Sequence, residues 1–155
     1  TGDVLGYIGM TGKTSGPHVH FEVRLVGPQG DMVQNPELWV APIVGRGVLA
    51  GRIRNDYANP LTAQEVWLKS VETGKSQLIM TYSPKTRQVD DYFKENFAVG
   101  DLVAGEYVIT IFYKGKWYNE TITVSPGTVN FVFFNGKNGF VQRHPSPPDP
   151  EEFLQ

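Results

Sequence analysis

Apolar and polar residues alternate most regularly between His18 and Val26. Every second side chain of a β-strand points to the same side, so this alternation predicts a strand. Its apolar face would consist of Val19, Phe21, Val23 and Leu25. Its polar face would consist of His18, His20, Glu22 and Arg24. A shorter strand is predicted before it, over Val4–Gly9, and the two are joined by a turn from Gly12 to Pro17.

Residues 46–135 hold further alternating or aromatic-rich runs, separated by turn residues. The turns recur about every 8 to 12 residues, a spacing that is typical of an antiparallel β-sandwich. Strands are predicted over Val48–Arg54, Glu65–Val71, Gln77–Tyr82, Tyr92–Val99, Tyr107–Tyr113, Trp117–Val124 and Thr128–Phe134. Around the fourth of these, the spacing of Val89, Phe93 and Phe97 would also suit a short helix. We therefore expect an all-β chain with a seven-stranded sandwich as its larger part.

The chain divides into three segments of different composition. Residues 1–45 are rich in glycine, residues 46–135 carry the strand pattern, and residues 136–155 end in a run of prolines. Proline cannot donate to a strand ladder, so the last segment is expected to be an extended tail. The sequence also begins at Thr1 with no initiator methionine and no signal peptide, and we expect it to be a fragment of a longer protein.

Composition excludes several classes of function. The chain has 155 residues, 14 Lys plus Arg and 16 Asp plus Glu, for a net charge of -2, and it has no basic stripe that would favour nucleic acid. No apolar run approaches the length of about 18 residues that a transmembrane helix needs. Cysteine is absent, which excludes disulfides, thiolate metal sites and cysteine nucleophiles.

The pair His18 and His20 carries the most specific chemistry. On a strand, two residues at this spacing project from the same face, with Cα atoms about 6.6–6.8 Å apart. Two imidazoles placed in this way can share a metal ion, or one can bind the metal while the other handles protons. Zinc suits such a site because it accepts neutral imidazole and carboxylate ligands. Glu22, on the same face, could orient one of the histidines.

The first segment contains three further motifs: Gly2-Asp3-Val4-Leu5-Gly6-Tyr7-Ile8-Gly9, Gly16-Pro17-His18-Val19-His20-Phe21-Glu22 and Asn35-Pro36-Glu37-Leu38. In these motifs the segment resembles the lysostaphin-type zinc metallopeptidases. The resemblance implies that residues 1–45 are the C-terminal fragment of a metallopeptidase domain. The implied protein is secreted or located in the cell envelope, extracellular or periplasmic, and cuts the peptide cross-links of peptidoglycan.

The resemblance also implies a role for each histidine. His20 matches the family's zinc ligand, and His18 matches the catalytic acid/base or the group that orients the attacking water. The family's two other ligands come from a His-x-x-x-Asp motif, which this sequence does not contain. Because a catalytic zinc ordinarily has three protein ligands, we expect this chain by itself to bind no zinc and to lack activity. Zinc would belong to the intact enzyme, and this fragment could contact a missing N-terminal half or another chain.

The second segment offers no convergent acid/base set. Asp90 and Asp91 are adjacent, so on a strand they would face opposite sides. The aromatic residues Trp67, Trp117, Tyr118 and Phe131–Phe134 could form a surface on which sugars stack. We expect them instead to fill the core, as aromatic residues on sandwich strands usually do.

Residues 46–135 contain a series of short apolar and turn motifs: Gly51-Arg52-Ile53, Asn59-Pro60-Leu61, Val66-Trp67-Leu68, Asn96-Phe97-Ala98-Val99 and Leu102-Val103-Ala104-Gly105-Glu106-Tyr107. In these motifs the segment resembles the carboxypeptidase regulatory-like domains. The resemblance implies a transthyretin-like, seven-stranded Greek-key sandwich that serves as an accessory module without catalytic activity. It leaves a second function open: an extracellular binding or interaction module that contacts cell-wall glycan or another protein.

Overall fold

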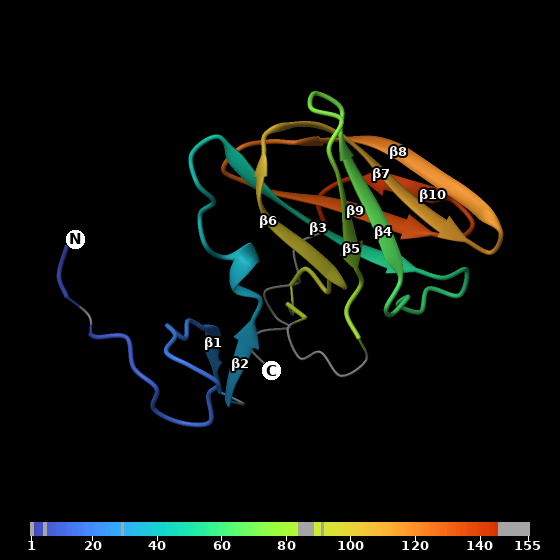
Figure 1. The fold of residues 1–155 in the computed structure, drawn as a ribbon. Coiled ribbons are helices and arrows are strands. Elements are labelled where there is room, and N and C mark those ends of the chain that lie inside the picture. The colour runs from blue at the N-terminus through green and yellow to red at the C-terminus, as the bar shows by residue number, and fades with distance from the viewer. Residues whose placement is uncertain (1, 5, 29, 84–88, 91, 146–155) are drawn as a thin grey trace.

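The structure is a computed structural model, and it describes residues 2–4, 6–28, 30–83, 89–90 and 92–145. The described chain is all-β, as the sequence predicted, and Figure 1 shows how its strands are arranged. The strands are β1 (Val23–Gly27), β2 (Gly30–Gln34), β3 (Arg46–Arg54), β4 (Glu65–Ser70), β5 (Ser76–Met80), β6 (Phe97–Val103), β7 (Gly105–Tyr113), β8 (Lys116–Val124), β9 (Val129–Asn135) and β10 (Gly139–Gln142). A single turn of 3-10 helix, η1 (Pro36–Leu38), follows β2.

Two four-stranded sheets form the larger part of the molecule. One has the order β10-β9-β3-β6 and the other has the order β5-β4-β7-β8. All pairs are antiparallel except β3 and β9, which run parallel. The inward side chains of both sheets belong to one buried cluster, which includes Leu49, Ile53, Val132 and Phe134 from the first sheet and Val66, Leu68, Ile109, Ile111 and Ile122 from the second. Burial of these alternate positions is the main force that holds the two sheets together.

The outer face of the β10-β9-β3-β6 sheet is also partly covered. Val48 and Ala50 of β3 and Phe131 of β9 form a second buried cluster with Leu38 of η1, and Phe93 packs against it. Strand β3 is therefore buried on both of its faces. The contact attaches the end of the N-terminal segment to this sheet.

Strands β1 and β2 form a separate two-stranded hairpin, which Figure 1 shows beside the two larger sheets. The strand predicted over His18–Val26 is shorter in the structure, where β1 begins only at Val23. The described residues of the segment Val4–Gly9 do not form the predicted strand. In that segment, Gly9 forms one isolated β-bridge with His18. Val19 and Phe21 of the predicted apolar face are 76% and 62% exposed. No layer of described residues covers these two side chains. Apolar alternation that is not buried in this way does not stabilise a longer strand.

The two large sheets together contain eight strands, one more than the seven predicted. The additional strand, β10, lies in the segment that was expected to be a proline-rich tail, and it pairs with β9. Its Phe140 is 7% exposed, and its ring lies 4.9 Å from that of Phe134. Residues 146–155 of the predicted tail lie outside the described residues.

The predicted strand over Tyr92–Val99 is also different in the structure, because β6 begins at Phe97. The Asp90 carboxylate explains the change: its Oδ1 accepts hydrogen bonds from the backbone N–H groups of Tyr92 and Phe93, both at 2.8 Å. A side chain that caps successive backbone donors in this way favours a turn over a strand. The turn continues through Lys94, which has a φ of 47°.

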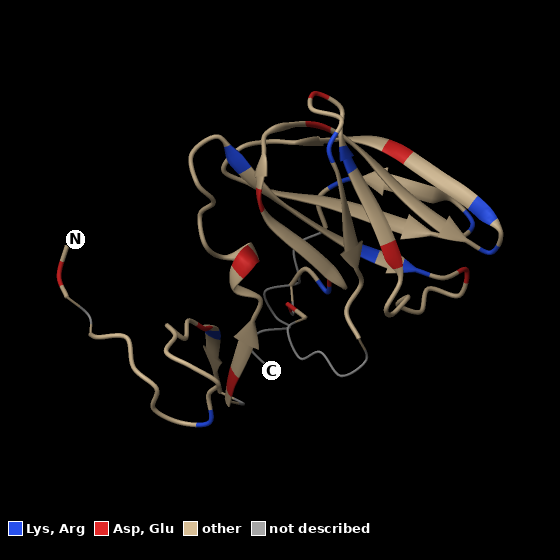
Figure 2. Cartoon of the chain, viewed as in Figure 1, with Lys and Arg blue, Asp and Glu red and all other residues tan. Residues whose placement is uncertain are grey.

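Charged residues are distributed over the whole molecule. Figure 2 shows acidic and basic positions interspersed on both large sheets and on the hairpin. Across the described ranges, η1 is the helical element, and no helix there is long and apolar enough to cross a bilayer.

Candidate functional site

The polar row that begins at His18 is present in the structure as a set of short contacts. His20 Nε2 lies 2.9 Å from Glu22 Oε1. The other carboxylate oxygen of Glu22 accepts a hydrogen bond of 2.8 Å from Arg24 Nε and one of 2.5 Å from Arg24 Nη2. The hydrogen bonds from His20 and then from Arg24 hold the pKa of the Glu22 carboxyl below its ordinary value. Glu22 thus lies between His20 and Arg24 as an ionised acceptor.

The loop before His18 fixes the orientation of that ring. His18 Nδ1 lies 2.9 Å from the carbonyl oxygen of Gly16 and 3.1 Å from Thr14 Oγ1. Thr14 Oγ1 in turn donates to the Gly16 carbonyl at 2.6 Å and accepts from the Gly16 N–H at 3.0 Å. A neutral imidazole that donates from Nδ1 to a carbonyl has its unprotonated nitrogen at Nε2. His18 can therefore accept a proton at Nε2.

The two histidines do not form a zinc site with the described residues of this chain. Their ring centroids are 6.4 Å apart, whereas two imidazoles bound to one tetrahedral zinc would have centroids about 5.2 Å apart at Zn–N distances near 2.0–2.1 Å. Nowhere in the described part of the chain do three His, Cys, Asp or Glu side chains converge closely enough to hold a metal. His20 Nε2 also lies within hydrogen-bond distance of Glu22. The donor set present does not fit a catalytic zinc.

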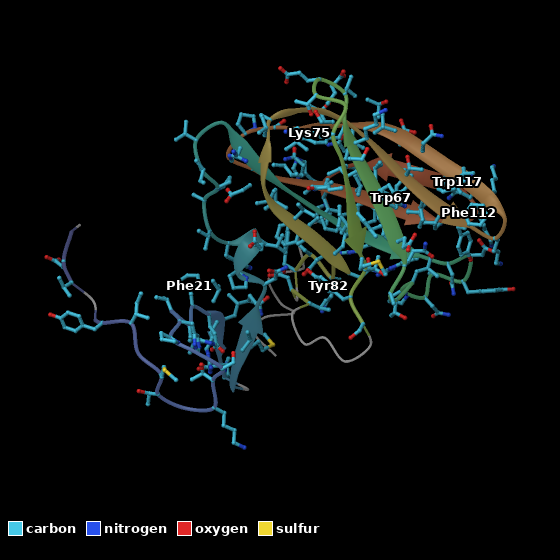
Figure 3. All side chains as sticks on the ribbon, viewed as in Figure 1. Phe21, Trp67, Lys75, Tyr82, Phe112 and Trp117 are labelled. Carbon is cyan, nitrogen blue, oxygen red and sulfur yellow. The ribbon has the colours of Figure 1, made fainter. Side chains whose placement is uncertain are left out.

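The expectation that Trp67 and Trp117 fill the core was wrong, because both lie on the outer face of the β5-β4-β7-β8 sheet, beside Phe112, which was not part of that expectation. Trp67 is 40% exposed, Phe112 is 48% exposed and Trp117 is 60% exposed. They alternate with inward residues such as Val66 and Ile111, and so they project to the solvent side. Figure 3 shows them on neighbouring strands, and the Phe112 and Trp117 rings have centroids 4.9 Å apart.

The other aromatic residues named in that expectation are buried or half-buried. Phe131 and Phe134 are buried, as expected, and Tyr118 is half-buried and packs against the main core. Tyr118 also donates a hydrogen bond to the carbonyl of Gly136 at 3.0 Å. The exposed aromatic face therefore consists of Trp67, Phe112 and Trp117, with the half-exposed Leu78 and Met80 of β5 beside them. We call this set the aromatic face.

A buried polar cluster, which the sequence did not reveal, lies where the N-terminal segment meets the large sheets. Glu95 is 1% exposed, and its carboxylate accepts hydrogen bonds from Asn35 Nδ2 at 3.2 Å and from the Asp90 N–H at 3.0 Å. Tyr82 OH lies 3.4 Å from the same carboxylate. Trp39 Nε1 donates to Asp90 Oδ2 at 2.5 Å. The cluster thus connects the residues around η1 to those before β6.

Burial shifts the pKa of two groups in this cluster. It raises the pKa of the Glu95 carboxyl above its ordinary value, against the lowering effect of the hydrogen bonds from Asn35 and from the backbone of Asp90. Burial together with the Glu95 charge also raises the pKa of Tyr82. The one sequence signal that could have pointed here is Asn35-Pro36-Glu37-Leu38, because Asn before Pro favours a helix start.

No protein-family model matches this chain, and no curated protein matches it.

Proposed function

We propose that this chain is the C-terminal region of a cell-envelope zinc metalloendopeptidase that acts on the peptide cross-links of peptidoglycan. The observation that carries the proposal is the ordered row His18, His20 and Glu22, which follows the Gly16-Pro17 turn of the lysostaphin-type motif. Such a protein works outside the cytoplasm, so the location we propose is extracellular or periplasmic.

Each residue of the row has a proposed role in the intact enzyme. His20 supplies one zinc ligand, and the Glu22 carboxylate at 2.9 Å orients its ring. His18 accepts and returns a proton at Nε2, because its Nδ1 is engaged by the Gly16 carbonyl at 2.9 Å. The remaining ligands would come from a His-x-x-x-Asp segment that this sequence lacks. By itself, the chain therefore binds no zinc and has no peptidase activity.

The rest of the chain has a proposed accessory role. The two four-stranded sheets support the assignment of residues 46–135 as a Greek-key sandwich of the transthyretin-like, carboxypeptidase regulatory-like kind. The contact of Leu38 with Val48 and Phe131 would hold this module against the end of the peptidase segment.

Zinc titration by calorimetry tests the first proposal, with the present chain and with a longer protein that includes a His-x-x-x-Asp segment. We expect saturable heat from the longer protein only. In that protein, His20→Ala should abolish both zinc binding and cleavage of purified sacculi, and His18→Ala should abolish cleavage while leaving zinc bound. His144→Ala, at an exposed histidine, is the matched control. Cleavage at the normal rate by the His18 and His20 variants would refute the assignment.

The aromatic face supports a second candidate, a non-catalytic module that binds cell-wall glycan. Three exposed aromatic rings lie on one sheet face, with Thr110 and Asn119 in the adjacent positions of β7 and β8. Sugar rings stack on aromatic side chains through their apolar C–H faces, and neighbouring polar side chains bond to their hydroxyls. Glu65 and Lys69 lie on the same face as Trp67, so the surface combines aromatic rings with polar and charged groups.

Co-sedimentation with purified sacculi tests the second candidate. We expect the chain to be retained, and the double variant Trp67→Ala/Trp117→Ala to remain in solution while keeping its fold. Tyr7→Ala, at a 97% exposed aromatic residue in the segment before β1, is the control for a general effect of losing an aromatic ring. Equal retention of the Trp67/Trp117 double variant and the wild-type chain would exclude the aromatic face as the binding surface.

A further inference from the structure

A cavity of about 550 Å³ lies beside the end of β3, and none of the roles proposed above uses it. The side chains that carry its chemistry are Arg52, Arg54, Thr62, Tyr82, Lys94 and Glu95. Its size falls in the range of small-molecule sites, about 300–1,000 Å³. Figure 3 labels Tyr82, which marks the position of the cavity at the end of the two large sheets nearest the hairpin.

Arg52 is held in a fixed orientation at this cavity. Its Nε donates to the carbonyl of Phe93 at 2.5 Å, and its Nη2 donates to the carbonyl of Tyr92 at 3.3 Å. Its guanidinium lies over the rings of Phe131 and Phe133, 5.6 Å and 5.4 Å from their centroids. Since a guanidinium has five N–H donors, three remain for another acceptor. Arg52 is thus oriented before any ligand arrives, which lowers the entropic cost of binding.

Arg54 projects from the same face of β3, two residues after Arg52. Within the described ranges, no carboxylate lies within ion-pair distance of either guanidinium. Burial, and then the charge of Arg54, lower the pKa of Arg52. Two partly desolvated cations that repel each other are stabilised by an anion placed between them.

The charge of Glu95, the acidic residue in the cavity wall, raises the pKa of Arg52 and so offsets part of this effect, but among the described residues it forms no ion pair with either arginine. The Glu95 carboxylate accepts its hydrogen bonds from Asn35, Tyr82 and the backbone of Asp90. Among the described residues of the wall, the two arginines therefore outnumber the one carboxylate, that of Glu95. The apolar Pro60 and Val89 and the ring of Tyr82 complete a wall that suits an organic group beside the charge.

We propose that this cavity is a binding site for an oxyanion group, either a carboxylate or a phosphate, bound between Arg52 and Arg54. Guanidinium groups bind both of these anions through pairs of parallel N–H···O bonds. The site is separate from the histidine row and from the aromatic face, and it does not rest on either proposed function.

Calorimetric titration of the whole chain tests the proposal with three probes: inorganic phosphate, N-acetyl-alanyl-alanine with a free carboxylate, and the same dipeptide as its C-terminal amide. We expect saturable binding of at least one of the two anions, weakened by added salt, and no binding of the amide. Binding of the dipeptide acid but not of phosphate would assign a peptide carboxylate as the ligand. The reverse result would assign a phosphate.

Variants connect the binding to the two arginines. Arg54→Gln should weaken binding by about tenfold or more, since one charge-assisted pair of hydrogen bonds is lost. Arg54→Lys should recover only part of the affinity, because it restores the charge without the planar fork. Arg46→Gln, at the opposite end of β3, should bind like the wild-type chain. Circular dichroism would verify that each variant folds. Absence of saturable binding of both anions to the folded wild-type chain, or full affinity in Arg54→Gln, would overturn the proposal.

Discussion

The side-chain amide of Asn35 donates a hydrogen bond of 3.2 Å to the buried carboxylate of Glu95, 60 positions later in the chain. Asn35 also begins η1, where its Oδ1 accepts from the Glu37 N–H at 3.1 Å. One residue therefore ends the hairpin, starts the short helix and satisfies a buried acid. This contact joins the N-terminal segment to the loop before β6.

Replacing Asn35 should destabilise the protein more than an exposed asparagine would. Asn35→Ala removes the helix cap and leaves the Glu95 carboxylate with one donor fewer, and each effect costs on the order of 1–2 kcal/mol. We expect a decrease of about 2–3 kcal/mol in the free energy of unfolding, measured in urea. Asn119→Ala, at an exposed site on β8, should change it by less than about 0.5 kcal/mol. Equal effects of the two substitutions would contradict the role of Asn35.

Stability should depend on pH through Glu95. Because burial raises the pKa of its carboxyl, the folded protein keeps this proton to a higher pH than the unfolded chain does. The contribution of Glu95 is complete below the pKa of Glu in the unfolded chain, about 4.3, and is lost as the pH rises through the raised pKa. Across that interval, the folded state binds more protons, so the free energy of unfolding falls as pH increases.

Glu95→Gln isolates this contribution, since an amide does not titrate. Urea unfolding of the variant and of the wild-type chain over a pH series should give two curves whose difference changes between the pKa of Glu95 in the unfolded chain and its raised pKa in the folded protein, and is constant outside that interval. Glu65→Gln, at an exposed glutamate on β4, should follow the wild-type curve. A constant difference between Glu95→Gln and wild type at every pH would show that Glu95 has an ordinary pKa.

Gly51 in β3 should not tolerate a side chain. A Cβ built at this position would lie 2.5 Å from Cε1 of Phe97 and 2.8 Å from the carbonyl oxygen of Val132. Since Phe97 is fully buried and the carbonyl belongs to the neighbouring strand β9, neither atom can move easily. Gly51→Ala should cost about 3 kcal/mol or more, measured by thermal or urea unfolding. Gly6→Ala, where no atom lies within 4 Å, should have almost no effect.

Strand β10 should contribute to the core, although the segment that contains it looks like a tail. Phe140→Ala removes a ring that packs against Phe134 at 4.9 Å, and we expect a loss of about 3 kcal/mol in the free energy of unfolding. Val141→Ala, on the opposite side of the strand and 47% exposed, should cost less than about 1 kcal/mol. If Phe140→Ala has no greater effect than Val141→Ala, β10 is not packed on the core as described.

Local alternation was sufficient to predict several strands of the larger sheets. The predicted strands Val48–Arg54 and Trp117–Val124 agree with β3 and β8 to within two residues. Strand β3 is buried along most of its length, and β8 buries Ile122 and Val124 near its end, so burial stabilises each strand where its apolar residues lie. The pattern failed at His18–Val26, because it does not reveal whether an apolar face will be covered.

The local pattern likewise predicted some parts of the candidate sites and not others. The sequence placed His18, His20, Glu22 and Arg24 on one side, and the hydrogen bonds among the last three follow from that spacing. It did not locate the cluster around Glu95, whose members lie between positions 35 and 95 and meet only through tertiary packing. It also could not place Trp67 and Trp117, since a tryptophan on a strand suits either face of a sandwich.

The sequence by itself thus determined the all-β class and the regular strands of the larger sheets, because both depend on a period of two residues. Only the tertiary structure decided which aromatic residues face solvent, which carboxylates are buried and which arginines line a cavity. Those properties depend on contacts between residues far apart in the chain, and a local pattern carries no record of them.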